Sequence, residues 1–161
     1  MEQKELMIRS SKQKEIQSVY QQLINSWNEM NSEAFADLFA TDGSIVGFDG
    51  SQANGQSKIR KHLSGIFKDH EPARFVTITR EIRGLGPNAI LLRAVAGMVP
   101  RGKKEINPKT NAIQSLIVVE IEDQLKIALF QNTPAAFHGR PEISEQLTIE
   151  LQQQYEMDNP A

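Results

Sequence analysis

The apolar residues change their spacing once along the chain, near Pro72, and this change limits the folds available to it. Before Pro72 they recur three or four residues apart, which predicts amphipathic helices over about 16–30, 35–39 and 59–67. After Pro72 they form long β-branched runs that predict strands. These runs are 75–83, 89–99, 112–122 and 125–133. Helices followed by antiparallel strands predict an α+β fold with the helices packed on one face of the sheet.

Local signals place the remaining boundaries. Asn31-Ser32 offers a cap for the second helix, and Ser57 can cap the third. A short strand is predicted over 44–48. Residues 1–141 are predicted to form one domain and 142–161 a helical tail. The tail must dock on its own domain, dock on a partner, or fray.

Composition excludes several classes of protein. The chain has 161 residues, a net charge of −2 and no cysteine, which predicts one domain without disulfides or zinc–thiolate sites. The basic residues near Lys103 form a solvated loop rather than a nucleic-acid surface. The polar N-terminus and the absence of a long apolar run predict a cytoplasmic protein that does not enter a membrane.

The sequence predicts no metal site and no cofactor. The histidines His62, His70 and His138 lack ligand spacing, and no glycine-rich dinucleotide loop follows a strand.

The last hairpin predicts two different sheet faces. If Asp123-Gln124 is a two-residue loop, Gln114 and Gln131 share one face. The other face then holds Ser115, Ile117, Val119, Phe130 and Asn132. Both faces are apolar near the centre, so one face is expected to pack on the helices and the other on a second subunit, as in a twofold homodimer. In the alternative arrangement, the C-terminal helix of a monomer covers that second face.

Three stretches carry a resemblance to a known family. Ser26-Trp27-Asn28, residues 33–43 and residues 128–134 resemble the SnoaL-like branch of the nuclear transport factor 2-like, or cystatin-like, superfamily. Within that branch they are most similar to the SgcJ/EcaC type, over roughly 16–141. The resemblance implies a curved sheet wrapped around the first helix and enclosing a deep apolar pocket. It also implies carbonyl substrates of polyketide-like or steroid-like character where members are enzymes, and an oxidoreductase label for the SgcJ/EcaC type.

Two residues are candidates for chemistry in such a pocket. His62 lies at the edge of the third helix's apolar face, where it is either a partly buried structural histidine or a general base. Arg93 interrupts an apolar run and must reach solvent, pair with a carboxylate, or face the cavity and stabilise negative charge. Its candidate partners are Asp42, Asp49 and Glu120. The other predicted pocket residues are Trp27, Phe39, Phe48, Phe67, Gln114, Gln131 and His138.

Two functions therefore remain open. The first is binding of an apolar aromatic or polycyclic carbonyl compound, with cofactor-independent isomerisation, cyclisation or dehydration as the chemistry if the chain is an enzyme. The second is a non-catalytic ligand-binding or dimeric association domain of the same fold. No carboxylate lies in the middle of the apolar strand runs, because Glu81, Glu120 and Glu122 all fall near the ends of their runs, and this absence favours the second function.

Overall fold

The computed structural model describes residues 2–161 and confirms the predicted α+β class. Helices occupy α1 (Glu2–Asn28), α2 (Ser32–Asp37), α3 (Gln56–Asp69) and α4 (Pro141–Asp158), with a 3-10 turn η1 (Pro108–Thr110). Strands occupy β1 (Phe39–Val46), β2 (Gln52–Asn54), β3 (Arg74–Gly84), β4 (Ala89–Val99), β5 (Ala112–Ile121) and β6 (Gln124–Pro134). The first predicted strand therefore begins at Phe39 rather than at residue 44, and β2 was not predicted.

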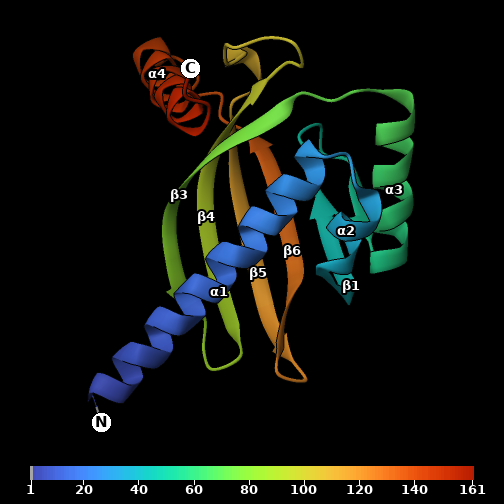
Figure 1. The fold of residues 1–161 in the computed structure, drawn as a ribbon, viewed down its shortest axis with the longest axis vertical. Coiled ribbons are helices and arrows are strands. Elements are labelled where there is room, and N and C mark those ends of the chain that lie inside the picture. Colours follow the sequence, from blue (N-terminus) through green and yellow to red (C-terminus); the bar gives the residue numbers. More distant parts are fainter. Residues whose placement is uncertain (1) are drawn as a thin grey trace.

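The strands form one curved sheet of order β2-β1-β6-β5-β4-β3. All neighbours are antiparallel except β1 and β6, which run parallel. Helix α1 crosses one face of the sheet, and α3 stands beside β1 at one edge (Figure 1). We call the face toward α1 the inner face and the opposite face the outer face.

The inner face and α1 enclose the main core. Tyr20 and Leu23 of α1 meet Leu92 and Leu116 at the centre of the sheet, and all four side chains are at most 1% exposed. Burial of such apolar area is the main stabilising term of a domain this size. The space between α1 and the middle of the sheet is thus filled by side chains.

The C-terminal helix docks on its own domain. Leu147 and Leu151 of α4 pack with Val95, Val99 and Ile106 into a second core on the outer face. Helix α4 covers only the end of the sheet nearest β3 and β4, as Figure 1 shows. Among the described residues, no comparable α4 packing is found on β5 and β6.

The predicted register of the last hairpin is wrong by one residue over its central part. The two-residue turn is Glu122–Asp123, with φ of 50° and 65°, and not Asp123-Gln124. A bulge between Ile117 and Val118 also shifts the pairing.

The corrected register changes which side chains share a face. Gln114 lies opposite Asn132, and Ser115 lies opposite Gln131. A one-residue slip turns every side chain of a strand to the other face. Asn132 and Phe130 therefore belong to the inner face, whereas Gln131 and Leu129 belong to the outer face.

Candidate functional site

A buried chain of polar side chains occupies the interior where a pocket was expected. Tyr20 Oη donates to Gln114 Oε1 at 2.5 Å, and Gln114 Nε2 donates to Asn132 Oδ1 at 3.2 Å. Burial raises the pKa of Tyr20 above the ordinary range for tyrosine. Because protein groups serve as these partners, Gln114 joins α1 to the sheet here rather than facing an open cavity.

The structure does not bring His62 and Arg93 together. His62 lies on α3 beside β2, whereas Arg93 lies on β4 and bonds Glu81 of β3, with its Nε 3.1 Å from Glu81 Oε2. Four strand spacings, about 19 Å at ~4.8 Å each, separate β2 from β4. Arg93 is 53% exposed on the outer face. Its partner there is Glu81 and none of the predicted carboxylates.

The predicted aromatic residues serve mainly as packing groups. Trp27 Nε1 donates to the carbonyl of Ala73 at 3.0 Å, and its ring lies 5.4 Å from that of Phe67. Phe39 is 1% exposed and Phe48 packs against the main core. The other two predicted pocket residues are Gln131, half-buried on the outer face, and His138, exposed in the turn before α4.

A recess opens where the first half of α1 leaves the sheet. We call this the α1 recess; it has a volume of about 530 Å³. Its inner-face side chains are Ile82, Ile90 and Leu125, which join the main core from the β3–β4 and β5–β6 hairpins. The recess therefore has an apolar floor at one end of the main core.

Polar groups line the rim of the α1 recess. Lys12 Nζ of α1 lies 3.5 Å from Glu120 Oε2 of β5. Arg83 also lines the recess, but its place opposite Leu91 turns its side chain to the outer face, where its guanidinium pairs with Glu81 at 2.7 Å. An ammonium group has three N–H donors, so one carboxylate leaves Lys12 with donors to spare. Gln13 and Asn88 add neutral polar groups. The rim can donate hydrogen bonds to a molecule whose apolar part occupies the floor.

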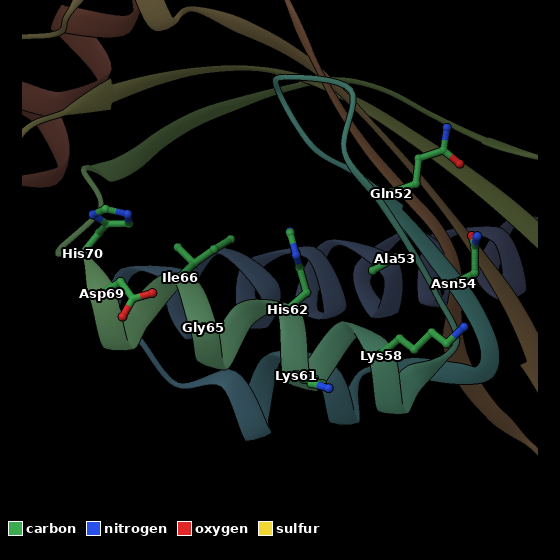
Figure 2. A pocket seen from close by; sticks show the side chains of 10 residues that line it. All are labelled: Gln52, Ala53, Asn54, Lys58, Lys61, His62, Gly65, Ile66, Asp69 and His70. Atoms are coloured by element: carbon green, nitrogen blue, oxygen red, sulfur yellow. The ribbon is translucent and has the colours of Figure 1, made fainter.

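A second hollow lies between β2 and α3. We call it the β2–α3 groove; it has a volume of about 630 Å³ and contains His62 (Figure 2). Its strand wall is Gln52, Ala53 and Asn54, and its helix wall is Lys58, Lys61, His62, Gly65, Ile66, Asp69 and His70. A third hollow, of about 660 Å³, lies between α4 and the outer face around Arg80 and Phe137.

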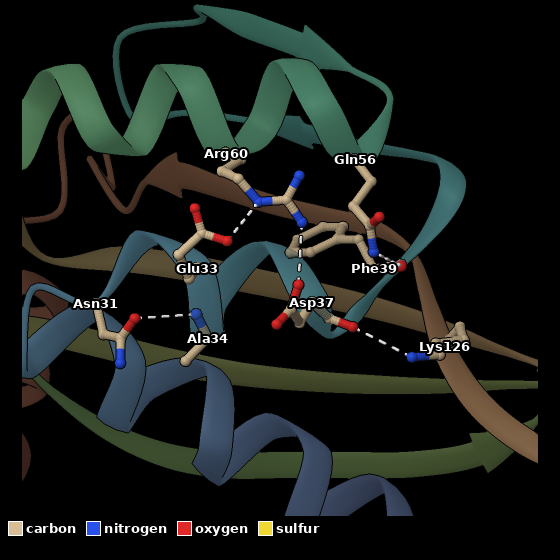
Figure 3. A network of polar contacts seen from close by, with 8 residues as sticks. All are labelled: Asn31, Glu33, Ala34, Asp37, Phe39, Gln56, Arg60 and Lys126. Atoms are coloured by element: carbon tan, nitrogen blue, oxygen red, sulfur yellow. Dashed lines mark hydrogen bonds and ion pairs between the residues drawn. The ribbon is translucent and has the colours of Figure 1, made fainter.

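A polar network fixes the helix wall of the β2–α3 groove against the rest of the domain (Figure 3). Arg60 of α3 pairs with Glu33 at 2.9 Å and with Asp37 at 3.0 Å, both on α2. Gln56 Nε2 donates to the Phe39 carbonyl at 2.9 Å, and Lys126 Nζ donates to the Asp37 carbonyl at 3.2 Å. Helix α3 is thereby tied to α2 and β1, and α2 is tied to β6.

The caps of the two helices in this network differ. Asn31 caps α2 as predicted, because its Oδ1 accepts the Ala34 N–H at 3.0 Å. The cap of α3 is Gly55 with φ of 98°, and not Ser57. That left-handed backbone explains why glycine occupies the position.

Sequence reasoning missed the α1 recess and the β2–α3 groove for the same reason. The α1 recess joins α1 to two hairpins, and the β2–α3 groove depends on a three-residue strand. The stretch 84–88, whose glycines and proline are typical of a hairpin turn, is the one sequence signal for the recess, whereas Lys58 and Lys61 are typical of an ordinary solvated helix face.

Among the described residues, there is no cluster of three or more histidine or acidic side chains that could hold a metal ion. Over the same part of the chain, no helix is both long and apolar enough to span a membrane.

Comparison with solved structures identifies the fold. A cystatin-like domain of unknown function from Nostoc punctiforme superposes with a TM-score of 0.72 at 20% identity, covering 86% of this chain and 88% of that one. A ketosteroid isomerase-like protein from Erwinia carotovora atroseptica gives a TM-score of 0.61 at 10% identity, over 76% and 95% of the two chains. The chain thus has the cystatin-like, or nuclear transport factor 2-like, α+β fold.

A third similar structure carries a different description. It is a putative calcium/calmodulin-dependent protein kinase type II association domain from Thiobacillus denitrificans, with a TM-score of 0.67 at 7% identity over 74% of this chain and 94% of that one. No family model matches the sequence, and no curated protein matches it. One fold therefore spans proteins described by catalysis and by association, and the function must be argued from this chain's own surfaces.

Proposed function

We propose that this chain binds a small apolar molecule with a carbonyl group in the α1 recess. The observation that carries the proposal is an apolar floor of Ile82, Ile90 and Leu125 beneath a rim that holds Lys12 and Gln13. A volume of about 530 Å³ lies within the range of small-molecule sites, roughly 300–1,000 Å³. The apolar body of an aromatic or polycyclic ligand fits the floor, and its carbonyl oxygen accepts from the rim.

The proposal is binding without proton transfer. Among the described lining residues the one carboxylate, Glu120, is paired with Lys12, and His62 and Arg93 lie elsewhere. The motifs at 26–28, 33–43 and 128–134 support placing the chain in the SnoaL-like branch, near the SgcJ/EcaC type. Its cytoplasmic location stays a prediction.

A thermal melt against aromatic ketones, polycyclic ketones and fatty acids tests the binding. A ligand at 100 times its Kd stabilises the folded state by about 2.7 kcal/mol, so a binder raises the Tm. Gly84 pairs with Ile90 and faces the recess, and a Cβ built there meets no atom within 4 Å. Gly84→Trp is therefore expected to fill the recess and abolish the Tm rise.

The matched control is Gly65→Trp, which places the same ring in the β2–α3 groove. Gly65 lines the β2–α3 groove, and a Cβ built there also meets no atom within 4 Å. Gly65→Trp should leave the Tm rise intact. A ligand whose effect survives Gly84→Trp and vanishes with Gly65→Trp would show that the recess is not its site.

A second candidate function is self-association through the uncovered outer face. Ile117, Val119 and Leu129 are half-buried there beside Ser115 and Gln131, beyond the reach of α4. The corrected register keeps the predicted β5 residues Ser115, Ile117 and Val119 on this face. On β6 it replaces the predicted Phe130 and Asn132 with Leu129 and Gln131. A second copy that packs its sheet on this face buries the patch symmetrically.

Sedimentation equilibrium tests this association. Ile117→Glu places a charge in the centre of the patch and should yield a folded monomer. Ile149 is 59% exposed on α4, so Ile149→Glu supplies the same substitution outside the patch and should leave a dimer intact. A wild-type monomer at micromolar concentration would exclude the interface.

A further inference from the structure

The β2–α3 groove has a free strand edge as one wall. Strand β2 ends the sheet order and pairs with β1 alone among the described strands. Gln52 and Asn54 of this edge strand are exposed residues. Helix α3 follows within two residues and runs beside the strand as the second wall, as Figure 2 shows.

Hydrogen bonding decides which main-chain groups of β2 are free. Gly47 N–H donates to Ser51 O and Gly55 N–H donates to Gly43 O, both at 2.7 Å. In an antiparallel pair, alternate residues turn toward the partner strand. The parity set by Ser51 and Gly55 leaves the amide and carbonyl of Gln52 and of Asn54 directed away from β1. Such an edge is a template for another extended chain.

The helix wall is basic. Lys58 and Lys61 supply two ammonium groups against one carboxylate, Asp69, among the lining residues. Asp49, in the turn before β2, lies outside the lining, and its carboxylate accepts the Ser51 N–H at 2.9 Å. That hydrogen bond lowers the pKa of Asp49, which keeps it ionised in the β1–β2 turn. The groove therefore favours an anionic occupant.

The middle of the groove has room for side chains. Ala53 and Ile66 provide apolar contacts, and Gly65 leaves the middle of the helix wall without a side chain. A strand added to β2 would lie about 4.8 Å from it, in the space between the two walls. A free phosphate or a small acid would use the lysines but would leave the main-chain donors and acceptors of β2 without partners.

We propose that the β2–α3 groove binds an extended acidic peptide of a partner protein, which adds to the sheet as a strand beside β2. Its main chain pairs with Gln52 and Asn54, and its carboxylates meet Lys58 and Lys61. Main-chain hydrogen bonds provide affinity in this mode, and the side-chain contacts provide selectivity. The site is separate from the α1 recess, so either can fail without the other.

Fluorescence anisotropy with a labelled peptide of alternating glutamate and valine tests the proposal. We expect saturable binding, and we expect it to vanish when alternate peptide amides are N-methylated, since methylation removes donors and blocks strand pairing. A lysine–valine peptide of the same length should not bind. Equal binding of the N-methylated peptide would overturn strand addition and leave charge attraction only.

Two substitutions test the helix wall and the strand wall of the groove separately. Lys61→Glu should weaken peptide binding by about tenfold, whereas Lys68→Glu, the same change on the same helix outside the lining, should change it less than twofold. Gln52→Pro removes an outward N–H without touching the β1–β2 ladder, because an edge strand tolerates proline where its N–H faces solvent. We expect this variant to keep its Tm and lose most peptide affinity.

Hydrogen exchange at the β2 amides is a measurement that nonspecific charge attraction should not change. The bound peptide should slow hydrogen exchange at Gln52 and Asn54, because their N–H groups become donors to the peptide. Binding with unchanged exchange at both amides would overturn the proposal. Pairing of two copies through β2, seen as dimerisation that the peptide does not reverse and Gln52→Pro abolishes, would also overturn it.

Discussion

Tyr20 and Gln114 join the first helix to the middle of the sheet through a hydrogen bond that solvent does not reach. They lie 94 positions apart in sequence, and their side chains are 1% and 0% exposed. A buried donor or acceptor without a partner costs more than a hydrogen bond gains, so this pair fixes how α1 sits on the sheet.

Removing the Tyr20 hydroxyl should destabilise the protein. Tyr20→Phe leaves Gln114 Oε1 without its donor, and we expect it to cost about 1–3 kcal/mol of unfolding free energy. Urea denaturation of Tyr20→Phe, Gln114→Met and the double variant measures the coupling. The double variant should lose less than the two single losses combined, because both polar groups are gone. Strict additivity would show that the hydrogen bond contributes nothing of its own.

The Tyr20 hydroxyl should also make the free energy of unfolding depend on pH in the alkaline range. Burial raises the pKa of Tyr20 in the folded state above its unfolded value, which is about 10. The folded state therefore retains a proton that the unfolded state loses. The contribution of Tyr20 is complete below about pH 10 and falls by about 1.4 kcal/mol per pH unit above it.

The measurement is the free energy of unfolding from pH 8 to 11. Tyr20→Phe should show a shallower alkaline loss than the wild type, whereas Tyr155→Phe, the same change at a half-buried position on α4, should follow the wild type. Parallel curves for the wild type and Tyr20→Phe would contradict the linkage.

The class of fold could be predicted from the sequence because the change of period at Pro72 extends over long segments. The register could not, because the bulge after Ile117 and the positive φ of Glu122 leave no mark in the hydrophobic pattern. The partner of Arg93 was missed for a related reason. Glu81 lies across the β3–β4 hairpin beside another irregularity, after Thr79, and only the folded register places the two side chains together.

Gly43 should not tolerate a side chain. It lies in the irregular segment of β1 that passes β6, and a Cβ built there would be 2.6 Å from the Ile127 carbonyl oxygen. Because the obstacle is backbone, Gly43→Ala is expected to cost about 1–3 kcal/mol. Gly65→Ala, in the open middle of α3, should instead stabilise by about 0.5–1 kcal/mol. Thermal melts of both variants measure the contrast, and equal effects would show that close approach at Gly43 is unimportant.

The docking of α4 should depend on the absence of a side chain at Gly97. A Cβ there would be 3.0 Å from Leu151 Cδ1 and 3.1 Å from Ile106 Cδ1, so Gly97→Ala forces the two apolar groups that seat the helix to move. The ion pair between Arg80 and Glu150 is about two-fifths exposed, and a pair so exposed is too weak to hold the helix alone. We therefore expect α4 to become sensitive to limited proteolysis in Gly97→Ala while the main core stays folded. Gly84→Ala, whose Cβ meets open space, should stay as resistant as the wild type. If Gly97→Ala is equally resistant, the second core adapts to the extra methyl group and Gly97 does not control the docking of α4.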